Sequence, residues 1–201
     1  IVGRLLKATI IIYAARVLGV AGFGTFSYVM GLASLLTAFS DLGMSPIVVR
    51  EGAKNPQLRA RYFSTALGLT SLLALASAVI IIFGAPLITK IPISQTLVLV
   101  VALGFVLDMI KGLVGSAIFR AQEKMEGEAL VNIVTQLALV GTGFYLLTRI
   151  PSPENLALAY AVGSAIGLVL ALYLVRGYIR QFIARFERAL VKPILSATIP
   201  M

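Results

Sequence analysis

The chain has 201 residues, of which 59% are hydrophobic and only 12% are charged, and its mean hydropathy is +1.00. Soluble domains carry roughly 25% charged residues, so this composition indicates a membrane protein. The net charge of +9 would favour nucleic acid in a soluble chain, but here the basic residues lie mostly between apolar blocks, where they set membrane topology. We therefore expect no nucleic-acid partner.

Two apolar blocks open the chain, residues 1–18 and 23–42, and a glycine-rich turn at residues 19–24 joins them. Each block is close to the ~20 residues needed to cross the hydrocarbon core of a bilayer. The pair predicts a helical hairpin across the membrane. Ile1 already lies within the first apolar block, so we expect the chain to be a fragment. No small-residue cleavage site follows this block, so we do not interpret it as a cleaved signal peptide.

The stretch from Ala15 to Glu51 reads AARVLGVAGFGTFSYVMGLASLLTAFSDLGMSPIVVRE. Its Ala-Arg, Leu-Gly, Phe-Gly and Asp-Leu-Gly elements, in this order and spacing, resemble the opening of the polysaccharide-biosynthesis flippases. These form the oligosaccharide-lipid branch of the superfamily that also holds the multidrug and toxin extrusion carriers. The resemblance implies the N-terminal half of a transporter whose two lobes are parallel repeats around a central cavity.

Four further apolar blocks follow, and they cover residues 64–88, 94–119, 129–148 and 155–175. Short proline-containing connections at residues 89–93 and 149–154 are predicted turns. We therefore predict an all-α polytopic membrane bundle in residues 1–175. It would have six transmembrane helices, and the resemblance implies that these form one lobe of a two-lobe transporter.

Most basic residues lie on one side of this predicted topology. Eleven of the seventeen lysines and arginines fall in one set of alternate connections, three fall in the other set, and three lie inside spans. The side with eleven is cytoplasmic by the positive-inside rule, which places both ends of the chain in the cytoplasm of a cell-membrane protein. Residues 176–201 form a second region, which we interpret as an amphipathic helix on the cytoplasmic surface or a solvated linker. The resemblance implies that this region joins the lobe to a second one.

Small residues recur along one face of three spans. In lipid, close helix contact depends on such residues because the hydrophobic effect does not drive helices together. The stripes therefore predict helix packing. They are Ser27, Gly31, Ser34, Ala38 and Asp41 in the second span, Gly68, Ser71, Ala74 and Ala78 in the third, and Ala159, Gly163, Gly167 and Ala171 in the sixth.

Charged residues inside spans each cost about 2.5 kcal/mol or more at the bilayer centre and so usually face a partner or a water-filled cavity. Asp108 and Lys111 are three residues apart in the fourth span and share one helix face. One interpretation is a mutually neutralising pair inside the bundle. The other is a cavity-lining pair whose contact is broken by protonation or by an arriving anion.

Five other polar residues are candidate site residues. Arg4 and Lys7 share a face of the first span and either lie inside the membrane, where they would attract a diphosphate, or extend to the headgroups. Asn132 and Gln136 are one turn apart in the fifth span and suit either sugar hydroxyls or interhelical hydrogen bonds. Asp41 ends the second span as an interfacial acid or as the partner of a base.

The sequence holds no enzyme signature, since it lacks histidine, cysteine and any phosphate-binding loop of the Gly-Lys-Ser/Thr type. We expect no catalytic residue, no metal and no cofactor. The resemblance implies translocation of a polyprenyl-diphosphate-linked oligosaccharide from the cytoplasmic to the outer leaflet by alternating access. In that interpretation Arg4, Lys7 and Lys111 bind the anion, Asn132 and Gln136 bind sugar, and Asp108 and Asp41 act in gating or coupling.

Three alternatives stay open. Multidrug or cation extrusion would require acidic residues in the spans without neutralising cations. Export of lipid II is a closer rival within the same superfamily. A membrane scaffold for glycosyltransferases would have fully paired charges in its spans and no lateral cavity. The expected partners are the lipid-linked oligosaccharide and membrane lipids, with a polysaccharide polymerase or glycosyltransferases as further candidates.

Overall fold

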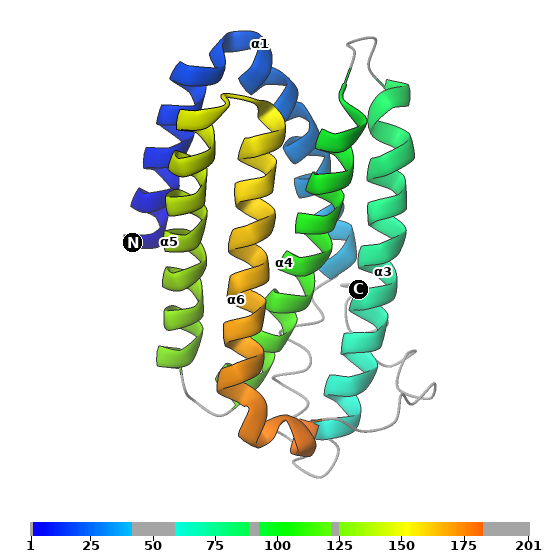
Figure 1. Cartoon of the computed structure of the whole chain (residues 1–201). Coiled ribbons are helices and arrows are strands. Elements are labelled where there is room, and N and C mark those ends of the chain that lie inside the picture. The colour runs from blue at the N-terminus through cyan, green and yellow to red at the C-terminus, as the bar shows by residue number, and fades with distance from the viewer. Residues whose placement is uncertain (1, 42–58, 89–92, 122–124, 183–201) are drawn as a thin grey trace.

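The protein is described by a computed structural model over residues 2–41, 59–88, 93–121 and 125–182, and these residues form a bundle of helices without strands (Figure 1). The helices are α1 (Val2–Asp41), α3 (Arg59–Ile88), α4 (Gln95–Ala121), α5 (Met125–Arg149) and α6 (Pro153–Phe182). All five are long and apolar enough to cross a membrane. The described part of the chain is thus all-α, and the chain is a multi-pass membrane protein.

Helix α1 has 40 residues and a sharp kink at Gly19, where φ is 66° and ψ is −177°. This backbone conformation is essentially restricted to glycine. Figure 1 shows α1 rising to one end of the bundle, turning over and descending again. The predicted first and second spans are therefore two arms of one kinked helix. The described residues give five helices where six were predicted, because helical structure resumes directly after Gly19 and the expected turn at residues 19–24 shrinks to one residue.

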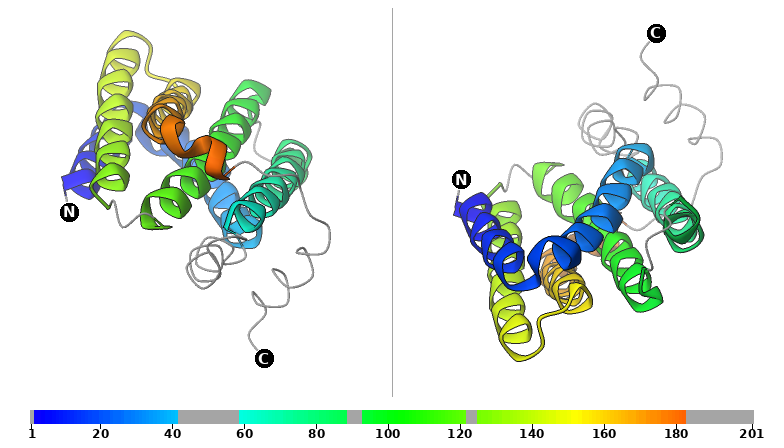
Figure 2. Two further views of the ribbon diagram at one scale, coloured as in Figure 1. Left: turned by 90° about the horizontal axis from the view of Figure 1, so that it is seen from below. Right: turned by 90° about the horizontal axis from the view of Figure 1, so that it is seen from above.

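The two arms of α1 pack against different neighbours. On the first arm, Ile10 lies so close to α5 that a Cβ atom at Gly143 would be 2.9 Å from the Ile10 Cδ1 atom. On the second arm, the Tyr28 hydroxyl donates a hydrogen bond of 3.4 Å to the carbonyl oxygen of Ala85 in α3. Viewed along the bundle, the first arm and α5 lie at one side and α3 at the other (Figure 2).

The small-residue face predicted for the sixth span is buried in α6, and this prediction is confirmed. Its members Ala159, Gly163, Gly167 and Ala171 are all buried. A Cβ atom at Gly163 would lie 3.0 Å from the backbone oxygen of Thr135 in α5, and one at Gly104 of α4 would lie 3.3 Å from the Cα atom of Ala161. Helix α6 is thus held by close backbone contact to both α4 and α5.

The stripe predicted on the second span does not pack within the described part of the chain. Ser27, Gly31 and Ser34 are exposed, and a Cβ atom at Gly31 would meet nothing within 4 Å. The prediction of a packed face is wrong for these residues, since the second arm turns its opposite face, with Phe26, Val29 and Ala33, into the core. The side chains of Ala38 and Asp41 lie outside the described residues. The third-span stripe is divided, because Ala74 and Ala78 are buried and Gly68 is exposed.

The apolar core has two clusters of buried side chains. The larger cluster includes Ile10, Val29, Ile81, Leu97 and Leu156, and draws on all five helices. The smaller cluster lies where α3 begins and α6 ends, and it includes Phe63, Leu113, Phe119, Val131 and Val175.

Local hydrogen bonds and one ion pair link the ends of consecutive helices. Between α5 and α6, the Ser152 Oγ atom accepts the Asn155 backbone N–H at 3.2 Å, which caps the N-terminus of α6. Pro153 occupies the first turn, where its missing N–H costs nothing. Between α4 and α5, the Arg120 guanidinium donates two hydrogen bonds of 2.9 and 3.0 Å to the Glu128 carboxylate. This carboxylate raises the pKa of Arg120 above its usual value.

Helix α6 continues through Arg176 to Phe182, so the boundary predicted between the sixth span and the surface helix falls inside a helix. Most of the predicted surface helix and linker, residues 183–201, lies outside the described residues.

Candidate functional site

A cavity of about 330 Å³ lies among both arms of α1 and helices α4, α5 and α6. Five of the seven predicted site residues line it, and they come from three different helices. These residues are Lys7, Asp108, Lys111, Asn132 and Gln136. The structure therefore brings together side chains that the sequence singled out separately, and it also adds Tyr160 and Ser164 from α6.

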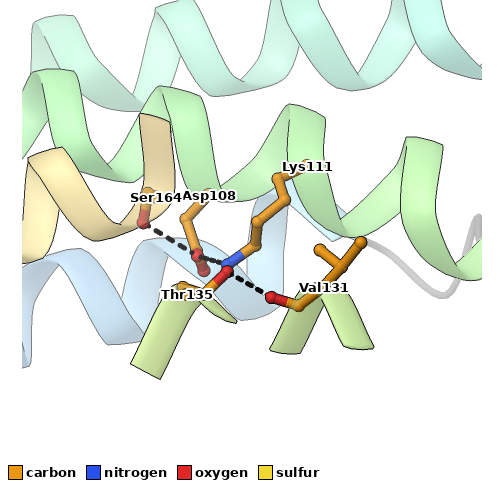
Figure 3. Close-up of polar contacts among 5 residues, drawn as sticks. All are labelled: Asp108, Lys111, Val131, Thr135 and Ser164. Atoms are coloured by element: carbon orange, nitrogen blue, oxygen red, sulfur yellow. Dashed lines mark hydrogen bonds and ion pairs between the residues drawn. The ribbon is translucent and has the colours of Figure 1, made fainter. Parts of the chain in front are cut away.

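Asp108 and Lys111 form an ion pair in the wall of this cavity. The Lys111 Nζ atom is 2.5 Å from the Asp108 Oδ1 atom, and the Ser164 hydroxyl donates a second hydrogen bond to the same oxygen at 3.1 Å (Figure 3). Asp108 is the central residue of α4, about 20 Å from either end of that helix at 1.5 Å per residue. The pair has features of both interpretations, because it is mutually neutralised and also lines a cavity.

The two members of this pair differ in accessibility. The Lys111 side chain is 11% exposed, whereas the Asp108 side chain is 54% exposed. The stem of Lys111 fits because Gly167 of α6 has no side chain: a Cβ atom there would lie 2.9 Å from the Lys111 Cδ atom and would clash with the Thr135 hydroxyl. Thr135 is held in place because it donates a hydrogen bond of 2.7 Å to the Val131 carbonyl oxygen (Figure 3).

Lys7 reaches the cavity from the first arm of α1 and has a different kind of partner. Its Nζ atom lies over the Tyr160 ring, 5.4 Å from the ring centroid. No carboxylate among the described residues forms an ion pair with it. The Tyr160 ring in turn contacts Phe26, with centroids 5.6 Å apart. Lys7 is therefore a cation without an ion-pair partner among the described residues.

Gln136 follows Asn132 by one turn on α5, and both residues line the cavity. The Gln136 Oε1 atom is buried and accepts no hydrogen bond from the described residues. A buried carbonyl oxygen without a donor is unfavourable by about 1–3 kcal/mol. A ligand hydroxyl or a water molecule in the cavity would satisfy it.

The other two predicted site residues cannot be placed in the cavity. The backbone of Arg4 lies in α1, one turn before Lys7, and Asp41 is the last residue of α1. The side chains of both lie outside the described residues.

Two site residues were missed by the reasoning from sequence, Tyr160 and Ser164. Ser164 directly follows Gly163 of the small-residue stripe, and Tyr160 directly follows Ala159. The signal present was their own spacing, because residues four apart lie on the same face of a helix. The pattern could not say which helix they would face.

The charge of the cavity follows from these placements. Among the described residues that line it, Lys7 and Lys111 are cations and Asp108 is the single carboxylate. On the second arm of α1, the Ser34 and Thr37 hydroxyls donate to carbonyl oxygens of their own helix at 2.8 and 3.0 Å. The described lining therefore has an excess of positive charge and is suited to an anion that also carries hydroxyl groups.

Comparison with known proteins gives one match. A family model described as polysaccharide biosynthesis protein matches residues 1–201 of the chain. No curated protein and no solved structure matches it significantly.

Proposed function

The chain belongs to the polysaccharide biosynthesis protein family, and from this premise we propose that it is one lobe of a flippase. Its substrate would be a polyprenyl-diphosphate-linked oligosaccharide, moved across the cell membrane from the cytoplasmic to the outer leaflet. The two arms of α1 would cross the membrane separately, which gives six spans and places both ends in the cytoplasm. The protein would be a transporter and not an enzyme, and pathway enzymes such as a polymerase or glycosyltransferases would be its partners.

The observation that carries this proposal is the cavity that Lys7 and Lys111 line, with Lys111 one turn from the centre of α4. A lysine in the middle of a membrane is unfavourable unless it serves a partner or a water-filled cavity. A diphosphate provides several anionic oxygens for the two ammonium groups, while Asn132 and Gln136 offer hydrogen bonds to sugar hydroxyls. The lipid tail can stay in the bilayer beside the bundle.

Asp108 would act as a gate. It holds Lys111 at 2.5 Å, and a diphosphate that enters the cavity competes for the same ammonium group. When Lys111 turns to the anion, Asp108 keeps the Ser164 hydrogen bond but loses its counter-ion. The carboxylate is then available to another cation, which would couple substrate binding to a gradient.

The charges of the cavity support this proposal over two alternatives. A glycosyltransferase scaffold predicts that charges in the spans are fully paired, whereas Lys7 has no ion-pair partner among the described residues. Cation extrusion requires a free acidic group, whereas Asp108 is already neutralised by Lys111. Export of lipid II would use the same diphosphate chemistry and is distinguished by the sugar alone.

The test follows movement of a labelled polyprenyl-diphosphate sugar between leaflets of vesicles that contain the complete transporter. Lys7→Gln and Lys111→Gln should each slow the movement, and the double variant should abolish it. The matched control is Arg149→Gln, which removes one positive charge from the exposed end of α5 and should leave transport unchanged. Transport by the double variant at the wild-type rate would overturn the proposal, as would export of an organic cation in place of the anionic lipid.

A further inference from the structure

The two lysines of the cavity are held in different ways. The Lys111 ammonium is in contact with a carboxylate, whereas the Lys7 ammonium lies over an aromatic ring. An ion pair neutralises a cation and occupies some of its N–H donors. A ring stabilises the cation through its quadrupole, leaves its charge in place and leaves its donors free.

The Tyr160 ring is itself fixed by its surroundings. One contact is with Phe26 of the second arm of α1, at a centroid distance of 5.6 Å. Its chain neighbours Ala159 and Ala161 are both buried, which anchors this turn of α6 in the bundle. The ring is therefore a rigid platform at the cavity wall, whereas a lysine side chain has four rotatable bonds and needs such a platform to keep one position.

We propose that Tyr160 is a positioning residue that holds Lys7 as the first contact for an anionic ligand, and that Lys111 engages the same ligand second, after it leaves Asp108. This order rests on the proposed function, since it assumes a diphosphate in the cavity. The ligand meets Lys7 without breaking an ion pair. At Lys111 the ligand has to compete with Asp108 for the ammonium group, which is a less favourable step.

The first test needs no ligand. In the complete transporter, lysine side chains are labelled by ¹³C-dimethylation, which keeps their charge, and Lys7→Arg and Lys111→Arg assign the two signals. The Lys7 signal should be shifted upfield by the ring current of Tyr160. Tyr160→Leu should abolish this shift and Tyr160→Phe should preserve it. A Lys7 signal that is unchanged in Tyr160→Leu would overturn the positioning role.

The second test is titration of the same labelled protein with geranyl diphosphate. The Lys7 signal should move at lower ligand concentration than the Lys111 signal, and Asp108→Asn should remove this difference because Lys111 is then free. Tyr160→Leu should weaken binding roughly ten-fold, Tyr160→Phe should restore it, and in a Lys7→Gln background the leucine variant should have no further effect.

The outcomes distinguish failure of the proposed order of contact from failure of the proposed function. If geranyl diphosphate moves Lys111 first or together with Lys7, the order of contact is wrong while the anion-carrying function stands. An equal loss of affinity from Tyr160→Leu with and without Lys7 would show that the ring acts structurally and not through Lys7. If neither lysine responds to geranyl diphosphate, the proposed function fails and the order fails with it.

Discussion

Replacing Gly167 by alanine should both loosen the bundle and disturb the cavity. The added Cβ atom would clash with the Thr135 hydroxyl and lie 2.9 Å from the Lys111 Cδ atom. The lysine stem can shift, but Thr135 is buried and its hydroxyl is bonded to the Val131 carbonyl oxygen at 2.7 Å. Overpacking of this kind typically costs about 1–3 kcal/mol.

The matched control is Gly141→Ala on α5. Both glycines lie within helices, so alanine brings the same gain in helix propensity at each position. A Cβ atom at Gly141 would meet nothing within 4 Å. The difference in the free energy of unfolding between the two variants therefore isolates the clash, and we expect Gly167→Ala to be the less stable by about 1–3 kcal/mol.

A second substitution tests the cause. Thr135→Ala removes the hydroxyl that the new methyl group would meet, so the double variant should be more stable than the sum of the two single effects predicts, by on the order of 1 kcal/mol. Thr135→Ser keeps the hydroxyl and should give no such relief. The free energies come from SDS titrations of the purified protein followed by circular dichroism. Equal stability of Gly167→Ala and Gly141→Ala, or additive effects with Thr135→Ala, would refute the reasoning.

Three further predictions concern the kink, a helix connection and the outer face. Gly19→Ala should destabilise the fold by about 1–3 kcal/mol, because a side chain is strained at the backbone φ of 66° found at residue 19. Gly24→Ala should be neutral or stabilising, because a Cβ atom at residue 24 would meet open space. Thermal unfolding compares the stability of the two variants. Glu128→Gln removes a partly exposed ion pair with Arg120 and should lower the free energy of unfolding by less than about 1 kcal/mol. The accompanying decrease in melting temperature should vanish at high salt. A decrease that does not depend on salt would contradict an electrostatic origin. Phe83 is 67% exposed on α3, and residues 1–201 hold no tryptophan. In Phe83→Trp, the tryptophan introduced into this lobe should emit in the blue and be quenched by brominated lipids; red-shifted emission that resists quenching would show that this face is not in lipid.

The helices were largely predictable because a membrane requires about 20 apolar residues for each crossing. Residues 64–88, 94–119, 129–148 and 155–175 all lie within described helices, apart from the first residue of the fourth predicted span, Ser94. The error at Gly19 has a local cause. Composition can identify a glycine-rich turn, but it cannot tell whether the turn takes six residues or one, which depends on the backbone angles of a single glycine.

Packing faces were predicted less well than helices. A stripe of small residues shows that one face of a helix can be approached closely, but it does not show whether a neighbouring helix lies there. The stripe on α6 is buried, since α6 lies among α4, α5 and α1. The equivalent stripe on the second arm of α1, represented by Ser27 and Gly31, is exposed. Periodicity is a property of one helix, whereas burial depends on where the neighbouring helices lie.

The candidate site was predictable to the extent that charges are unfavourable in a membrane. That cost singled out Lys7, Asp108 and Lys111, and all three line one cavity. Ser164 and Tyr160 could not be found in this way, because hydroxyl groups and aromatic rings are tolerated in spans for many reasons. Ser164 is 56 residues from Asp108 in the chain, and no periodic pattern connects two such distant helices.

Helix packing and the candidate site depend on the same residue in this bundle. The sequence indicated that Gly167 belongs to a stripe that serves helix packing, and it does lie buried against α5. The missing side chain also leaves room for the stem of Lys111, whose ammonium group reaches Asp108 from there. A residue that lets helices approach closely therefore also determines where a cation sits in the cavity. For that reason a change that alters only packing at Gly167 should alter the Asp108–Lys111 contact as well, whereas the same change at Gly141 should not.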